Sequence, residues 1–548
     1  MLHVRTRVTT VALTGGAIAA LALGASANAG GSAGDPATWT SVSAAAKATG
    51  VTVPNVLSPQ LTETVVAQGA MRLDGGTANV PYYGYDGDFP ALLPAPGDVP
   101  AAGHLVEASK TEPDKNTYLV LNGVKGADPA YRYGRHFLFQ GHETGTTGYL
   151  TRVNLDADAA HRVTLLATTD VDGNPLPLYD GSTWNPFARH LLLSSEEGTD
   201  GGIWQATLDY PSQVQDVSSV FGRAGYEGIQ TDAAGNVWIV EDAGGATIPG
   251  SKVKLPNSFV YRFVPVDKTD LTKGGTLQAL QVISRLTGQP ITFQPIDAAH
   301  PNGNALSADQ KDLHVYGNTF QTRWVTVNDT ATDPSGAPFD ANALAKAAGA
   351  TPFKRPENGQ FRPGTGFRQF LFAETGDTDA TSIANDDYGG WTTVFSLSQP
   401  SPSANTGVLR MLYKGDEAHA GFDNVTFLDA THVAFVEDAG DTLHTQRGAL
   451  DTAYVLDVTH NYTDGAQPVR FIAEGRDPSA TIDSALGAFT GFQNEGDNEI
   501  TGIHASNGDP TARGLLGAQV PHLFKDGWRL FWTQQHGDNE TWEVLPAG

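Results

Sequence analysis

From about residue 69 onward, short apolar runs alternate with short polar segments, and few stretches have the period of a helix. The apolar runs are rich in β-branched and aromatic residues, and Gly, Asp and Asn separate them, which is typical of strands and turns. Helical patterns are expected near 340–350 and, within a segment rich in Ala, Ser and Thr, near 41–48. The pattern therefore predicts an all-β protein.

The apolar runs belong to a repeat, in which a strand ends in an acidic or polar cluster and an aromatic-rich strand follows. Six such strand ends are recognised, at 137–143, 191–197, 237–242, 370–377, 433–438 and 530–536. Similar β units of roughly forty or more residues are typical of propeller blades. The sequence predicts a six-bladed β-propeller with insertions between the blades, the largest at 265–350. Two β-sandwiches with chance similarity are the alternative.

The N-terminal segment has the pattern of a secretory signal peptide. Arg5 and Arg7 precede an apolar stretch from Val11 to Leu23, and a small-residue cleavage site ends at Ala29. We expect a signal peptide at 1–29, a lead-in at 30–68 and the propeller domain at 69–548. The apolar stretch is too short for a membrane anchor, so a secreted protein of bacterial type, without membrane association, is predicted.

The chain is strongly acidic, with 60 Asp and Glu against 34 Lys and Arg and a net charge of -26. This charge argues against a nucleic-acid partner, because a phosphate backbone needs a basic surface. Solubility explains part of the charge, and bound divalent cations are the second explanation. The chain has no cysteine, so core size or bound metal must stabilise it without disulfides. Separately, we expect the protein to be a monomer.

The repeat brings carboxylates together, because the start of one strand and the end of the next share an edge in an antiparallel hairpin. Around a propeller axis, these edges meet at one face. Crowded carboxylates raise each other's pKa, and a cation relieves the repulsion. Oxygen donors favour Ca²⁺ or Mg²⁺, with Fe³⁺ or manganese as further options. The predicted metal ligands are Glu196, Glu197, Glu227, Glu241, Glu357, Glu374, Asp377, Glu437 and Glu499.

Arg355 and His536 are the candidate catalytic residues. Arg355 lies two residues before Glu357, and a guanidinium beside bound metals can clamp a phosphoryl group with two hydrogen bonds. A salt bridge to the neighbouring carboxylates is the alternative. The chain has no serine-hydrolase elbow, phosphate-binding P-loop or zinc-protease motif, and 170–174 resembles a calcium loop so loosely that a turn is expected.

Several short motifs, in their order and spacing, resemble the PhoX-type bacterial alkaline phosphatases. They lie at 195–197, 226–228, 355–357, 498–502 and 531–537. The resemblance implies a six-bladed propeller with calcium and iron ions at one end of its tunnel, and hydrolysis of small phosphate monoesters outside the cytoplasm. By motif match, it implies that Glu227 and Glu357 bind metal and that Arg355 holds phosphate.

Two features distinguish this chain from that family. The family's cysteine ligand to iron corresponds to Ser195, and a twin-arginine signal is not visible. The sequence thus predicts a secreted phosphomonoesterase with Ca²⁺ and, as a second cofactor, Fe³⁺. A phytase- or lactonase-type calcium propeller hydrolase is one alternative. A non-catalytic, calcium-stabilised binding propeller is the other; Arg355 favours the enzyme over it, whereas Ser195 favours the binding propeller.

Overall fold

The computed structural model describes residues 32–47, 54–69, 71–86, 109–145, 147–196, 201–332, 336–475, 499–535 and 539–548. The signal peptide expected at 1–29 lies outside the described residues, as do Glu197 and His536, so these three assignments stay predictions. Strands make up most of the regular structure. Within the described ranges, no helix is both long enough and apolar enough to cross a membrane.

Two four-stranded antiparallel sheets come first along the chain. In each sheet the strands pair in sequence order, β5 to β8 in one and β9 to β12 in the other. Their bounds are β5 (Thr117–Val120), β6 (His136–Gln140), β7 (Leu150–Asn154), β8 (Val163–Ala167), β9 (Ser182–Asn185), β10 (His190–Ser195), β11 (Gly202–Ala206) and β12 (Val214–Asp216). The short helix α1 (Ser218–Phe221) follows the second sheet.

A nine-stranded sheet follows, in which two sets of four antiparallel strands are joined by β17. The long strand β17 pairs with both β16 and β21. The bounds are β13 (Tyr226–Thr231), β14 (Val237–Glu241), β15 (Val260–Pro265), β16 (Gly275–Val282), β17 (Phe320–Asp329), β18 (Pro356–Phe361), β19 (Gln369–Glu374), β20 (Thr393–Ser398) and β21 (Thr406–Lys414). The region expected as the largest insertion, 265–350, holds β17, α2 (Ala308–Leu313) and α3 (Ala341–Ala347), and α3 confirms the helix expected near 340–350.

The last two large sheets combine strands from both ends of the described chain. Strand β1 extends the sheet of β22 to β25, and β2 extends the sheet of β26 to β28 by pairing with β28. Part of the segment expected as a lead-in therefore belongs to these sheets. The bounds are β1 (Val56–Leu57), β2 (Leu61–Ala67), β22 (Phe422–Phe427), β23 (His432–Glu437), β24 (Thr452–Asp457), β25 (Val469–Ala473), β26 (Glu499–Ser506), β27 (Arg529–Gln535) and β28 (Thr541–Pro546).

The helix expected at 41–48 is absent from the described part of that segment, 41–47. The N–H of Val42 donates to the carbonyl of Arg470, and the N–H of Leu450 donates to the carbonyl of Ala45. The prediction was wrong because the segment lies extended against the sheet of β22 to β25. This pairing satisfies its backbone groups in place of the helical bonds that its alanines favour.

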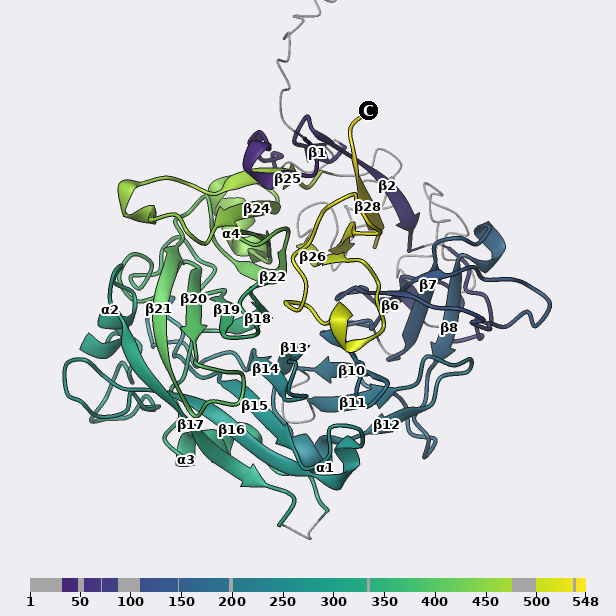
Figure 1. Cartoon of the computed structure of the whole chain (residues 1–548). Helices are drawn as coiled ribbons and strands as arrows, with labels where there is room; N and C mark the ends of the chain where they lie inside the picture. The colour runs from purple at the N-terminus through teal and green to yellow at the C-terminus, as the bar shows by residue number, and fades with distance from the viewer. Residues whose placement is uncertain are drawn as a thin grey trace, which may run out of the picture.

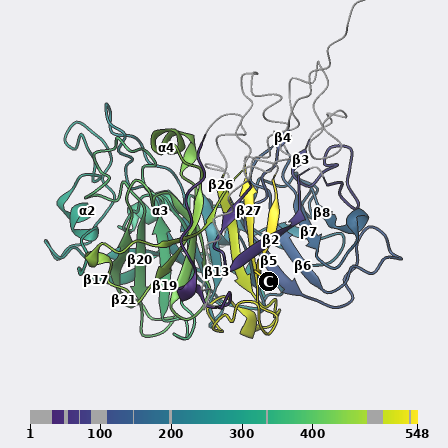
Figure 2. The same cartoon turned by 90° about the horizontal axis from the view of Figure 1, so that it is seen from above.

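The sheets surround a central axis (Figure 1). The first strands of successive four-strand sets contact one another in the order β5, β9, β13, β18, β22 and β26, and β26 contacts β5, which closes the ring. Seen at right angles to that view, helix α4 (Gly440–Arg447) and the paired strands β3 (Tyr85–Asp86) and β4 (Ser109–Lys110) lie toward the same end (Figure 2). The expected all-β, propeller-like architecture is confirmed.

The hydrophobic core lies between the faces of neighbouring sheets. Leu191, Leu192 and Leu193 are successive residues of β10, and all three are fully buried. Leu191 and Leu193 pack in one cluster with Phe139, whereas Leu192 packs in another with Ile229. A strand covered on both faces is a continuous apolar run. Each such side chain contributes about 1.5–3 kcal/mol, and this packing holds the strand ends in place around the axis.

Candidate metal centre

A cavity of about 50 Å³ at the α4 end of the ring is lined by acidic side chains. Asp438, two residues before α4, is one of them. We call this space the acidic cavity. The described residues that line it are ten carboxylates and one arginine: Asp114, Glu143, Asp180, Glu196, Glu227, Asp242, Arg355, Glu357, Asp423, Asp438 and Glu499.

The carboxylates come from two positions of the repeat. The first position is at or just before the start of a ring strand, and it supplies Asp114, Asp180, Glu227, Glu357, Asp423 and Glu499. The second position follows the next strand directly or after two residues, and it supplies Glu143, Glu196, Asp242 and Asp438. These positions share an edge of each hairpin, so the ring gathers them at one end.

At two strand ends, two acidic residues are adjacent in sequence, and the one that lines the acidic cavity is not the one predicted. Asp242 and Asp438 line it, whereas the predicted ligands Glu241 and Glu437 do not. Neighbouring side chains on a strand point to opposite faces. Glu241 accepts hydrogen bonds from the hydroxyl of Tyr261 (2.9 Å) and the N–H of Phe259 (3.0 Å). The second residue of each pair, rather than the predicted first one, therefore faces the acidic cavity.

Glu437 is held by a buried ion pair with helix α4. Its Oε1 lies 3.0 Å from Nη1 of Arg447, a residue of α4. The hydroxyl of Thr452 donates to its Oε2 at 2.8 Å. Glu437 therefore joins α4 to its sheet, and this contact accounts for its position outside the acidic cavity.

Glu374 and Asp377, also predicted as ligands, lie outside the acidic cavity and hold the residue before Arg355. The N–H of Lys354 donates to Oε1 of Glu374 at 2.8 Å, and Nε2 of His314 lies 2.9 Å from Oε2 of Glu374. The ammonium of Lys354 lies 3.1 Å from Oδ1 of Asp377, and both side chains are fully buried. These contacts fix the backbone that leads into the cavity.

Arg355 has a backbone conformation that needs such support. Its φ of 51° lies in the left-handed region, which costs free energy for a residue with a side chain. The N–H of Thr375 donates to the carbonyl of Arg355 at 2.9 Å. In this repeat, Thr375 occupies the position that Asp242 and Asp438 occupy in theirs.

The guanidinium of Arg355 bridges carboxylates from three repeats. Its Nε lies 2.7 Å from Oδ2 of Asp242, and its Nη2 lies 2.7 Å from Oε1 of Glu357 and 3.5 Å from Oδ2 of Asp438. The salt bridge considered from the sequence is thus present. The side chain is 17% exposed, so the guanidinium also reaches a surface that a ligand can approach.

Three groups of carboxylates have the spacing of metal-ligand sets. Within each group, one carboxylate oxygen per residue lies within 4.8 Å of the others. The groups are Glu143 with Asp180 and Glu196, Glu196 with Glu227 and Asp242, and Glu227 with Glu357 and Asp423. Glu196 and Glu227 each belong to two groups, an arrangement that suits bridged ions. The donor set is entirely oxygen, which fits Ca²⁺ or another hard cation.

Burial and mutual repulsion raise the pKa of most of these carboxyls. Burial, followed by the charge of Asp242, raises the pKa of Glu196 to about 8. Burial and the charge of Asp114 raise the pKa of Asp423 to about 6. The pKa values of Glu227 and Glu357 are raised well above the ordinary value, chiefly by burial. A bound cation removes the repulsion and favours the ionised carboxylates.

Buried amides orient the deeper carboxylates. The side-chain N–H₂ of Asn358 donates to Oε1 of Glu227 (3.0 Å) and to Oδ1 of Asp423 (3.2 Å). Asn424 donates to Oδ2 of Asp423 at 2.7 Å and accepts a hydrogen bond from the ammonium of Lys115, also at 2.7 Å. Lys115 is buried and interacts electrostatically with Asp114, Asp423, Glu227 and Asp180 of the cluster.

Asp114, Glu143 and Asp180 were not among the predicted site residues. Asp114 and Asp180 precede β5 and β9, which have only four residues each, and β9 is mostly polar. Strands this short give a weak pattern in the sequence, so their repeats were recognised without a first strand. The rule that found Glu227 would have found both aspartates had these strands been recognised.

Ser195, which the motif resemblance aligns with a cysteine, is not among the residues that line the acidic cavity, whereas its neighbour Glu196 is. The Ser195 hydroxyl is buried and has no hydrogen-bond partner within the described part of the chain. Alternation along β10 separates these two side chains. Among the described residues of this strand end, Glu196 is the one whose carboxylate lines the acidic cavity.

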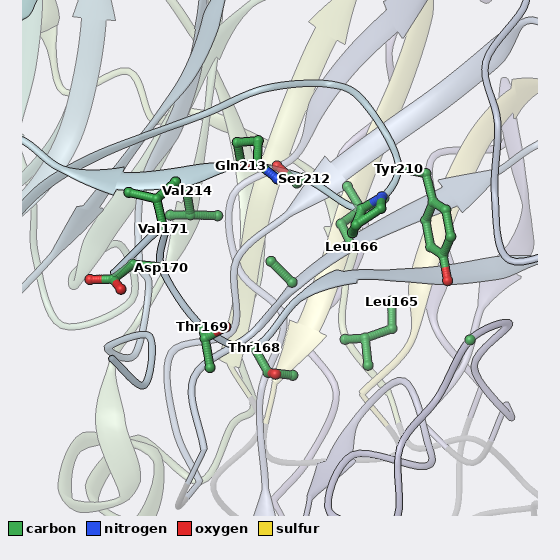
Figure 3. A pocket seen from close by; sticks show the side chains of 13 residues that line it. Leu165, Leu166, Thr168, Thr169, Asp170, Val171, Tyr210, Ser212, Gln213 and Val214 are labelled. Atoms are coloured by element: carbon green, nitrogen blue, oxygen red, sulfur yellow. The ribbon is translucent and has the colours of Figure 1, made fainter. Parts of the chain in front are cut away.

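A larger cavity of about 410 Å³ lies between β8 and β12 (Figure 3). Its described lining residues include few groups that could bind a metal. Leu165, Leu166 and Tyr210 line it, and Asp170 is the single carboxylate among its described lining residues. Oδ1 of Asp170 accepts hydrogen bonds from the N–H groups of Asp172 and Asn174. This confirms the turn expected at 170–174 and leaves the acidic cavity as the better candidate.

Comparison with known proteins gives a family match over part of the chain and a shared fold. Residues 253–512 match the family described as alkaline phosphatase PhoX. Among solved structures, PhoX of Pseudomonas fluorescens in complex with vanadate, described as a transition state analogue, is similar with a TM-score of 0.51 and 12% identity, covering 93% of this chain and 98% of that chain. At this identity the likeness shows a shared fold.

Two further solved structures are more distant. Sqt1 of Chaetomium thermophilum has a TM-score of 0.33 and 11% identity, with 75% of this chain and 81% of that chain covered. TolB of Acinetobacter baumannii has a TM-score of 0.27 and 11% identity, with 79% and 64% covered. No curated protein matches the chain. Through residues 253–512, and in agreement with the resemblance of its motifs, the chain is similar to the alkaline phosphatase PhoX family.

Proposed function

We propose that this protein is a metal-dependent phosphomonoesterase. The observation that carries the proposal is the position of Arg355, a partly exposed guanidinium among ten clustered carboxylates. Carboxylates alone repel a phosphate ester, so the site suits this substrate only when cations occupy it. The match of residues 253–512 to the PhoX family and the shared fold with a PhoX structure in complex with vanadate support this chemistry.

The proposal includes a six-bladed propeller. The nine-stranded sheet counts as two blades, because β13 to β16 and β18 to β21 each pair in sequence order and β17 only joins them. Each of the six ring strands contributes one carboxylate to the acidic cavity. This regularity supports one ligand position per blade.

The three carboxylate groups are the proposed ligand sets, with Ca²⁺ as the main ion and Fe³⁺ as a second one. The bound ions would supply positive charge that attracts the phosphoryl oxygens and stabilises the charge of the transition state. The chain's own residues do the rest. Arg355 donates hydrogen bonds to phosphoryl oxygens, and its ion pairs with Asp242 and Glu357 fix the orientation of its guanidinium. Without cysteine, an iron ion would have oxygen ligands.

His536 remains a proposed catalytic residue, as a proton donor or acceptor. The preceding residue, Gln535, donates from its side-chain nitrogen to Oε2 of Glu143 at 2.8 Å. The end of β27 therefore lies at the acidic cavity. Secretion, a monomeric state and action on small phosphate esters, without nucleic acid or membrane, belong to the same proposal.

The first experiment combines elemental analysis of the purified protein with turnover of p-nitrophenyl phosphate on the same sample. We expect bound calcium, loss of turnover with EDTA and recovery with Ca²⁺. The Arg355→Ala variant should lose about 10²–10³-fold in kcat, because it removes a donor to the developing charge, while its metal content stays near that of the wild type.

Arg368→Ala is the matched control, since Arg368 is an exposed arginine outside the acidic cavity. Turnover unchanged by Arg355→Ala would refute the role of this residue. Calcium binding without turnover of any phosphate monoester, with Fe³⁺ also supplied, would refute the enzyme and support the binding propeller.

A further inference from the structure

A cavity of about 470 Å³, which we call the Phe339 cavity, lies directly beside the acidic cavity. The two share Glu196 and Asp242 as lining residues. Asp242 is the carboxylate that holds Nε of Arg355, so the Phe339 cavity begins at the proposed phosphate position. Its volume lies in the range of roughly 300–1,000 Å³ that is typical of small-molecule sites.

The amide side chains in the wall of the Phe339 cavity already have hydrogen-bond partners within the protein. Asn342 donates to Oε1 of Glu241 at 2.8 Å, and Asn257 donates to the carbonyl of Gly244 at 2.8 Å. Oδ1 of Asn257 accepts a hydrogen bond from the ammonium of Lys346 at 2.6 Å. These bonds shape the wall and leave few donors directed at a ligand.

The apolar part of the wall is formed by Pro338 and Phe339, with Ala224 and Ala243. Phe339 is half-buried, and its ring packs so closely on Gly222 that a Cβ at that glycine would lie 2.5 Å from a ring carbon. Its carbonyl accepts a hydrogen bond from the N–H of Arg223 at 2.7 Å. The ring is therefore a fixed surface on which a flat apolar group can stack.

The charge of the Phe339 cavity is negative. Glu196, Glu241, Asp242 and Asp340 are among its lining residues, and Arg223 is the cation among the described ones. The guanidinium of Arg223 already lies 2.8 Å from a carboxylate oxygen of Asp216, which does not line the cavity. A second phosphate group placed in this cavity would meet the carboxylates of Glu241 and Asp340, which lie outside the acidic cavity and are not paired with Arg355.

We propose that the Phe339 cavity binds the alcohol portion of the phosphate ester. It selects uncharged alcohols that carry an aromatic ring, such as a phenol or a nucleoside, over alcohols that carry further phosphate groups. This inference rests on the proposed function, because it assigns the leaving-group side of the same site. It also distinguishes this protein from a hydrolase of polyphosphorylated sugars or inositols, whose leaving groups are strongly anionic.

The test measures kcat/KM for three esters with the metal-loaded protein: p-nitrophenyl phosphate, glycerol 3-phosphate and inositol hexakisphosphate. We expect the aryl ester to be the best substrate and the inositol ester the poorest. Phe339→Ala should lower kcat/KM for the aryl ester about tenfold, mainly through KM, and change that for glycerol phosphate less than twofold. Leu286→Ala truncates an exposed apolar residue elsewhere and serves as the control.

Inhibition by inorganic phosphate shows whether the metal centre of the variant is intact, and its inhibition constant should be unchanged in Phe339→Ala. Asp340→Asn provides a second variant, because Asn also caps a helix well and Asp340 caps α3. It should raise the relative rate on the inositol ester. An equal loss on aryl and glycerol esters, or no loss on either, would overturn the inference. If the wild type hydrolyses none of the three with metal supplied, the proposed function itself fails.

Discussion

Glu357 illustrates how one residue acts differently in the metal-free and metal-bound protein. Its carboxylate is 3% exposed and lies 2.7 Å from Nη2 of Arg355. It also belongs to one of the metal-ligand groups, with Glu227 and Asp423. Without a cation, burial of so many carboxylates costs free energy; with a cation, the same residues contribute binding free energy to the folded state.

The Glu357→Gln variant should therefore change stability in opposite directions in the two states. In EDTA, its melting temperature should equal or exceed that of the wild type, because a buried carboxylate is removed. In Ca²⁺, its melting temperature should be lower than that of the wild type, because the free energy of unfolding falls by about 1–3 kcal/mol. The metal content should also fall. Differential scanning calorimetry and elemental analysis measure both effects.

Glu417→Gln is the control for this comparison, since Glu417 is exposed and outside the acidic cavity. A Glu357→Gln variant with unchanged metal content and an unchanged response to Ca²⁺ would show that Glu357 is not a ligand.

At the scale of elements, the pairing of β2 with β28 joins strands from opposite ends of the chain. Trp532 in the same sheet is fully buried, and its indole N–H donates to Oε2 of Glu63 in β2 at 3.0 Å. Ring closure therefore depends on a strand that precedes the rest of the propeller by more than forty residues. Such a contact stabilises the whole ring because it ties the first and last parts together.

The Thr64→Pro substitution tests this closure. The N–H of Ala547 donates to the carbonyl of Gln60, and Thr64 pairs with Glu543 four residues along the ladder. Hydrogen-bonded pairs alternate in an antiparallel ladder, so the N–H of Thr64 also faces β28. Proline removes this donor and should cost about 1–3 kcal/mol.

Chemical unfolding measures the Thr64→Pro effect, with Thr64→Ala as the control that keeps the backbone donor. Thr64 is exposed, so the alanine variant should unfold within about 0.5 kcal/mol of the wild type. Equal stability of the two variants would argue that β2 does not hold the ring closed.

At the scale of the whole molecule, the fold concentrates negative charge on its own axis. The net charge of -26 is spread over the chain, but the ring places ten carboxylates around one cavity of about 50 Å³. Among the described residues, Arg355, Lys115 and Lys254 are cations that interact with carboxylates of this cluster, too few to balance it. The stability of the metal-free protein must therefore depend on protonation of these carboxyls.

We expect the metal-free protein to lose stability as the pH rises from about 4.5 to about 8. Burial and the charge of Asp242 raise the pKa of Glu196 from 4.5 to about 8, and burial raises that of Asp423 from 3.8 to about 6. The folded state thus binds protons more tightly than the unfolded state in this window, and the stability from protonation is lost as pH increases.

Melting temperatures across this pH range, in EDTA and in Ca²⁺, measure the effect. In EDTA, the melting temperature should fall by several degrees toward pH 8, whereas saturating Ca²⁺ should remove most of the decline. Parallel curves with and without Ca²⁺ would contradict a cation site in the acidic cavity.

The sequence by itself determined where the strands lie and that carboxylates cluster at their ends. Continuous apolar runs such as 191–193 required strands covered on both faces, and carboxylates at strand ends, such as Glu227, required a shared edge in a hairpin. Residue types and their local order carry this information. Arg355 and Glu357 were found for that reason, and the structure places both in the acidic cavity.

Tertiary structure alone decided which side chains face the axis. Glu241 and Asp242 are neighbours of the same chemical type, and only the register of β14 turns Asp242 inward. Asp180 precedes a strand too short to recognise, and its role appears only when the ring closes. Phe339 lies about one hundred residues from Asp242 in sequence, so the cavity that they share exists only because separate segments pack together.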